Sequence, residues 1–69
     1  MTVAEFVKEQ RKKQHWTQKA LAFYGGVGLR FIRELEQGKT TLRMDKVNQI
    51  LDMFGGVLIV GPTDRSVYA

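Results

Sequence analysis

The chain has 69 residues, which makes it one domain or less, and a domain of this size has little interior to stabilise it. It contains no cysteine, so disulfides and cysteine-based metal sites are excluded. The net charge is +4, with +5 on residues 1–46 and −1 on residues 47–69, and the basic first part favours a polyanionic partner such as nucleic acid or an anionic membrane.

The first predicted element is a helix that begins near Val3. Residues 2–5 have the Thr-x-x-Glu pattern of a capping box, which is typical of a helix N-terminus. Phe6 and Val7 continue the helical spacing from Val3 and form the buried face. The basic residues that follow lie largely on the polar side, and we expect the helix to end near Gln14.

The second predicted helix covers roughly residues 18–24. Thr17 precedes it and is a good N-cap, because its hydroxyl can accept a hydrogen bond from the first turn. Residues 20–22 give the helix a compact apolar face. Gly25 and Gly26 end it, since glycine accepts the left-handed conformation at a helix C-terminus.

The third predicted helix runs over about residues 28–37. Val27, Ile32 and Leu35 have the spacing of an inward face, and the charged side chains fall elsewhere on the helix. Gly38 is expected to terminate it.

A fourth helix over residues 44–54 and a short strand complete the predicted elements. The helix has one apolar stripe, made of Met44, Val47, Ile50, Leu51 and Phe54. Val57–Val60 is short and rich in β-branched residues, and Gly61-Pro62 stops it, so it is predicted to be a single strand. We expect residues 62–69 to be a flexible tail.

The aromatic side chains are interpreted as mainly structural. Four phenylalanines are assigned mostly to the core: Phe6, Phe23, Phe31 and Phe54. Trp16 is expected to pack on the core rather than to serve as a stacking platform. His15 is the only histidine, and without evident metal or catalytic partners it is assigned to a loop.

The most informative unit is residues 17–38, two short helices that meet through a tight glycine turn. This is the pattern of a helix-turn-helix unit. Ala22 is small enough for the two helices to approach closely, and Gly26 lets the chain reverse between them. Val27 and Ile32 fill the wedge between the helices, which leaves the start of the third helix free to enter a DNA major groove.

These residues resemble a known family. The motif consists of Thr17-Gln18, Leu21-Ala22, Gly26-Val27, Ile32, Leu35-Glu36 and Gly38. Over residues 4–56 the chain resembles the lambda-repressor-like, or Cro/C1/XRE, helix-turn-helix family. Residues 28–39 and 41–49 further resemble the HipB-type antitoxins that pair with HipA-type kinase toxins. The resemblance implies an all-α fold of four to five short helices with one short C-terminal β-strand. It divides the chain into a DNA-binding domain at 1–56, a dimerisation strand at 57–61 and the flexible tail.

The resemblance also implies roles for individual residues. The base-reading residues would be Gly28, Leu29, Arg30 and Arg33. Leu29 would pack on a thymine methyl, and the two arginines would donate to guanine edges, the commonest specific base contact. The phosphate-binding residues would be Gln18, Lys19, Lys39, Thr41 and Arg43. Arg11 and Glu36 resemble a family pair that ties the first helix to the third. Glu34 is either solvated or accepts a hydrogen bond from a cytosine amine.

The C-terminal strand carries the expectation of a dimer. A lone strand over Val57–Val60 leaves its backbone groups unpaired and does not persist by itself. It either folds over the core or pairs antiparallel with the same strand of a second copy, and we favour the dimer. Two copies would present their third helices one helical turn apart on palindromic DNA.

The function expected from the resemblance is a dimeric transcriptional repressor, specifically the HipB-like antitoxin of a type II toxin–antitoxin operon that neutralises a HipA-like kinase toxin. A stand-alone XRE-type regulator and an interaction module that inhibits its partner without DNA stay open as alternatives. No nucleophile–base pair, carboxylate dyad or phosphate-cradling loop is evident, so we expect neither enzymatic activity nor a cofactor or metal. No targeting signal or membrane span is visible, which favours a cytoplasmic, nucleoid-associated protein without membrane contact.

Overall fold

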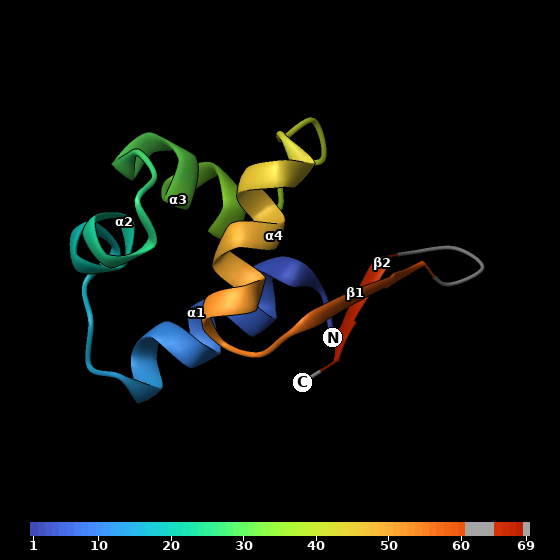
Figure 1. The fold of residues 1–69 in the computed structure, drawn as a ribbon, viewed down its shortest axis with the longest axis horizontal. Coiled ribbons are helices and arrows are strands. Elements are labelled where there is room, and N and C mark those ends of the chain that lie inside the picture. The colour runs from blue at the N-terminus through green and yellow to red at the C-terminus, as the bar shows by residue number, and fades with distance from the viewer. Residues whose placement is uncertain (61–64, 69) are drawn as a thin grey trace.

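The computed structural model describes residues 1–60 and 65–68, with the two strands described by their backbone alone. The described residues form four helices and a hairpin, arranged as Figure 1 shows. The helices are α1 Val3–Lys13, α2 Gln18–Gly25, α3 Leu29–Glu36 and α4 Met44–Met53, and the strands are β1 Val57–Val60 and β2 Arg65–Tyr68. The prediction of an all-α fold built from short helices is therefore confirmed, with four helices.

The N-terminus of α1 is closed by the predicted capping box. The Thr2 hydroxyl accepts a hydrogen bond from the Glu5 backbone N–H at 3.2 Å, and the Glu5 carboxylate accepts one from the Thr2 N–H at 3.0 Å. Two backbone donors that would otherwise lack partners at the helix start are satisfied in this way.

The turn between α2 and α3 has the geometry that its glycines indicate. Gly26 caps α2 with a left-handed φ of 70°, and the next residue, Val27, donates its N–H to the Ala22 carbonyl at 3.0 Å. Gly25 has a different role, which the sequence did not reveal. It is buried in the last turn of α2, and a Cβ atom there would collide with Cδ1 of Ile50 on α4. The glycine pair therefore provides both a reversal of the chain and a close α2–α4 contact.

All four helices contribute to one hydrophobic core. Its buried members are Phe6 and Val7 from α1, Leu21 and Ala22 from α2, Ile32 and Leu35 from α3, and Val47, Ile50 and Leu51 from α4. Partly buried side chains such as Trp16, Phe31 and Phe54 pack around these residues. The core prediction holds for three of the four phenylalanines, Phe6 being buried and the other two partly so.

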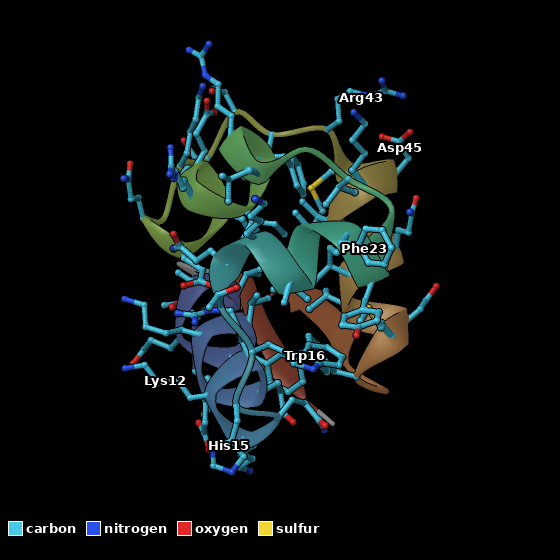
Figure 2. All side chains as sticks on the ribbon, turned by 90° about the vertical axis from the view of Figure 1, so that its left-hand side faces the viewer. Lys12, His15, Trp16, Phe23, Arg43 and Asp45 are labelled. Carbon is cyan, nitrogen blue, oxygen red and sulfur yellow. The ribbon has the colours of Figure 1, made fainter. Side chains whose placement is uncertain are left out.

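The assignment of Phe23 to the core is wrong. Its side chain is 80% exposed, and the neighbouring Tyr24 is 60% exposed. The physical reason lies in the helix register, because Leu21, Ala22 and Gly25 face inward on α2 and leave Phe23 on the opposite side. Figure 2 shows Phe23 at the far end of α2.

An aromatic cluster extends from this exposed end of α2 towards α4. The ring of Trp16 stacks on Tyr24 with a centroid separation of 4.8 Å, and Phe54 tilts against Trp16 at 6.2 Å. Phe23 meets Tyr24 edge-on at 5.5 Å. Trp16 is thus a half-buried packing residue, as predicted, although it also bridges to exposed aromatic surface.

The C-terminal strand forms as predicted, but it is not alone. Strand β1 pairs antiparallel with β2, with Val57 opposite Tyr68 and Val60 opposite Arg65. The prediction of a flexible tail is therefore wrong for residues 65–68, which form a strand. The reason is that their backbone groups pair with those of β1 in the same chain. The hairpin lies beside α1 and α4 in Figure 1. Residue 61 and the tail residues 62–64 and 69 lie outside the described part.

Candidate nucleic-acid interface

One face of α3 is buried and the opposite face is open. Ile32, Leu35 and Glu36 point into the protein, which fixes the rotation of the helix about its axis. Arg30 and Arg33 are exposed on the outer side, together with Gln37 at the C-cap. The predicted base-reading arginines therefore share a surface that other described elements do not cover.

Arg30 and Lys39 are held by a common carboxylate. The Arg30 Nε donates to Glu34 Oε1 at 3.0 Å, and the Lys39 Nζ donates to Glu34 Oε2 at 2.6 Å. The exposed fraction of the side chain is 91% for Arg30 and 22% for Glu34. Glu34 is thus an ion-pair partner of both cations, which differs from the two roles expected of it, a solvated side chain or a base contact. The four-residue spacing of Arg30 and Glu34 is a recognisable signal for such a helical ion pair.

The other predicted base-reading residues occupy different environments. The Arg33 side chain is exposed and makes no ion pair or hydrogen bond with the described residues. Leu29 is half-buried and packs against the core, so only part of its side chain faces outward. Gly28 is the exposed N-cap of α3, with an ordinary φ of −75° and open space where a Cβ would stand. The fold itself therefore does not require glycine at position 28.

The predicted phosphate-binding residues lie around α3, but they differ in how available their side chains are to a phosphate. Lys19 and Thr41 are exposed. Arg43 is the N-cap of α4 and makes two hydrogen bonds to the carboxylate of Asp45, at 2.7 and 3.2 Å. Both side chains are labelled in Figure 2. Gln18 is half-buried and donates from Nε2 to Glu36 at 3.2 Å, which directs its amide towards the interior.

A buried ion pair supports this surface from behind. Arg11 on α1 contacts both carboxylate oxygens of Glu36 on α3, at 2.7 and 3.0 Å, so the predicted Arg11–Glu36 pair is confirmed. The Arg11 guanidinium also donates to the Trp16 carbonyl at 2.9 Å. With Gln18 as a further donor, Glu36 connects α1, α2 and α3 and fixes how the second and third helices meet.

Two carboxylates of this surface, those of Glu34 and Asp45, have lowered pKa values. Hydrogen bonding to Lys39 and Arg30 lowers the pKa of Glu34 below its usual value. The Arg43 guanidinium lowers the pKa of Asp45 in the same way. Both groups are therefore anions at neutral pH, and each offsets positive charge that would otherwise face a polyanion.

Two features are absent from the described residues. These residues contain no cluster of three or more His, Cys, Asp or Glu side chains that is able to hold a metal ion. None of the described helices is long and apolar enough to cross a membrane.

Comparisons with known proteins assign the chain to a family. A family model described as helix-turn-helix matches residues 7–58. A protein of Sinorhizobium fredii, named as an uncharacterized HTH-type transcriptional regulator (y4mF), is 42% identical over 64 residues, which cover 91% of this chain and 84% of that protein. No solved structure matches significantly. Together with the α2–turn–α3 geometry, these matches show that the chain belongs to the XRE/Cro-like helix-turn-helix family.

Proposed function

We propose that this protein is a sequence-specific DNA-binding transcriptional repressor that reads operator DNA with the exposed face of α3. The observation that carries the proposal is the open surface with Arg30 and Arg33, fixed from behind by the buried Arg11–Glu36 pair. A rigid helix with two outward arginines suits insertion into a major groove, where arginine donates to guanine N7 and O6. The name of the Sinorhizobium relative supports a role in transcription regulation.

In this proposal the contacts divide into two groups. Arg30 and Arg33 read bases, Gly28 allows close backbone approach, and the outer part of Leu29 contacts a thymine methyl. The phosphate contacts come from Gln18, Lys19, Lys39, Thr41 and Arg43. Phosphate contacts position the protein, whereas base contacts choose the sequence. Gln18, Lys39 and Arg43 have internal partners in the free protein, so a phosphate competes with a protein contact at each of these residues.

The proposed binding unit is a homodimer. Strand β1 already pairs with β2, so an unpaired strand no longer provides the reason for dimerisation. A two-stranded sheet still leaves one edge of each strand open, and β1 edges of two copies can pair through Val57, Leu58, Ile59 and Val60 to make a continuous sheet. The small core provides a second reason, since a partner surface adds stability that a short chain lacks.

The finer proposal is that the repressor is the HipB-like antitoxin of a kinase toxin and acts in the cytoplasm at the nucleoid. It rests on the resemblance of residues 28–39 and 41–49. A stand-alone XRE-type regulator is the alternative within the same class. The adjacent reading frame discriminates the two, because a kinase-toxin-like gene beside this one is required by the antitoxin and not by the stand-alone regulator.

A protein-interaction module is the second candidate function. The observation that favours it is the exposed aromatic pair, Phe23 and Tyr24, because exposed aromatic side chains are enriched at protein interfaces. A salt titration separates the two functions. DNA binding through several phosphates must weaken steeply as salt rises, while binding through an aromatic surface does not.

The direct test of DNA reading compares Arg33→Ala with Lys12→Ala. Both side chains are exposed and unpaired among the described residues, and both variants lose one positive charge, but Lys12 lies on α1 away from α3. Preferred duplexes are first selected by the wild-type protein from a random library. Arg33→Ala should then lose about tenfold or more of the preference for the selected site over random DNA, and Lys12→Ala should retain it. Equal preference in the two variants would reject the base-reading role of Arg33.

The dimer is tested by removing residues 57–69. The shortened protein should sediment as a monomer and bind a palindromic site weakly, while its helical circular dichroism shows that the four helices persist. If the shortened protein still sediments with the mass of a dimer, β1 is not the interface.

A further inference from the structure

The central charged group on the outer face of α3 is an acid, which is unusual for a surface proposed to meet DNA. Glu34 follows Arg30 by one helical turn, on the side opposite the buried Ile32 and Leu35. The Glu34 side chain is only 22% exposed, and the exposed part of its carboxylate faces the same partner as Arg30. A DNA base that approaches the Glu34 carboxylate either repels it or donates a hydrogen bond to it.

We propose that Glu34 determines the specificity of α3: its carboxylate restrains Arg30 and Lys39 in the free protein and, on operator DNA, accepts a hydrogen bond from a cytosine amino group beside the guanine that Arg30 contacts. This inference rests on the proposed DNA-binding function and assigns one residue's role within it.

The first part follows from the charges of the cluster. One carboxylate contacts two cations, through separate oxygens, so the three side chains together carry a single positive charge. Attraction to DNA of any sequence grows with the number of phosphates that a protein neutralises. A Lys39 ammonium held 2.6 Å from Glu34 Oε2 is less available to a phosphate than a free lysine. Glu34 therefore weakens binding to random DNA.

The second part follows from the groups that bases present in the major groove. Guanine offers two acceptors there, thymine an acceptor and a methyl, and adenine an acceptor next to its amino donor. Cytosine alone presents a donor without an acceptor. A carboxylate that can only accept is repelled or left unpaired at the other bases, which costs affinity. Cytosine is thus the one base that donates a hydrogen bond to Glu34 without also presenting an acceptor that repels the carboxylate.

The geometry of the ion pair allows Arg30 to read a base at the same time. Glu34 contacts Arg30 through Nε, and the two terminal amino groups make no hydrogen bond with the described residues. Those two groups are free for guanine. This differs from Arg43, where Asp45 occupies both Nε and one terminal amino group. When Lys39 moves to a phosphate, Glu34 Oε2 becomes free for the cytosine amine.

The experiment compares Glu34→Gln with Glu9→Gln. Glu9 forms an exposed ion pair with Lys13 at the same four-residue spacing, on α1, so both variants lose one negative charge and one helical pair. Each variant and the wild type select duplexes from a random library. Dissociation constants are then measured for the wild-type selected site and for random DNA at one fixed salt concentration.

Glu34→Gln should lower the ratio of selected-site to random-DNA affinity about tenfold relative to Glu9→Gln, and its selected motif should lose the requirement for one cytosine. A ratio within twofold of the Glu9→Gln value, or a motif identical to the wild type, overturns the proposal. These outcomes differ from failure of the proposed function, in which the wild-type protein itself enriches no sequence.

Discussion

Replacement of Arg11 by methionine isolates the buried ion pair that joins α1 to α3. Methionine keeps much of the aliphatic length and removes the charge and its three hydrogen bonds. The Glu36 side chain is only 2% exposed and that of Arg11 is 14% exposed, so little water can replace the lost partner. The variant therefore leaves a buried carboxylate with Gln18 as its remaining side-chain donor.

The expected loss of unfolding free energy is large for a domain of this size. Removal of one partner of a buried pair costs about 3–5 kcal/mol, and a domain of this length has a total stability of about 3–10 kcal/mol. Arg11→Met should therefore leave the protein marginally folded. The double variant Arg11→Met/Glu36→Met removes both charges and should be more stable than Arg11→Met alone, because no uncompensated carboxylate remains.

Urea denaturation followed by far-ultraviolet circular dichroism measures both variants against the wild type. Lys13→Met is the matched control, because its exposed pair with Glu9 contributes less than about 1 kcal/mol. The reasoning is refuted if Arg11→Met costs no more than the control. The single variant Glu36→Met is measured in the same way to complete the cycle. The reasoning is also refuted if the double variant loses the sum of the Arg11→Met and Glu36→Met losses, since the two charges would then act independently.

Three further predictions concern stability. Phe23→Ser should change the unfolding free energy by less than about 0.5 kcal/mol, because Phe23 is exposed. Phe6→Ala should cost about 3–5 kcal/mol, because Phe6 is buried. Thermal unfolding measures both variants, and equal losses would show that Phe23 is buried in solution. Gly26→Ala should cost about 1–2 kcal/mol, because position 26 has a left-handed φ of 70°, and an unchanged urea midpoint would contradict the turn geometry. Finally, the depressed pKa of Glu34 means that its ion pairs stabilise the fold above its ordinary value of 4.5 and are lost as pH falls through the lower native value. Glu34→Gln should therefore lose less stability than the wild type between neutral pH and acid, measured as urea midpoints, and parallel pH profiles would argue against these pairs.

The sequence predicted the helices well because their signals are local. Thr2, Thr17 and Gly26 determine where elements begin and end through bonds within a few residues, and the structure contains each of these caps. The Arg11–Glu36 pair joins residues 25 positions apart, and only the family resemblance indicated it. A long-range contact of this kind leaves no periodic pattern in one sequence.

Features that depend on packing in three dimensions were missed. Phe23 was assigned to the core because of its apolarity, but the inward face of α2 is already occupied by Leu21, Ala22 and Gly25. The close approach of Gly25 to Ile50 requires knowledge of how α2 crosses α4. Strand β2 was missed because Arg65–Tyr68 is short and follows Gly61-Pro62, so only its pairing with β1 identifies it.

Helix α3 separates the residues that stabilise the fold from those that face a binding partner, so its binding specificity can be changed without loss of the fold. Stability depends on Ile32, Leu35 and Glu36, while Arg30, Arg33 and Gln37 project outward and contribute little to the core. A library randomised at positions 30, 33, 34 and 37 would therefore consist largely of folded members. The helix can acquire new partners through a few substitutions without redesign of the domain that presents it.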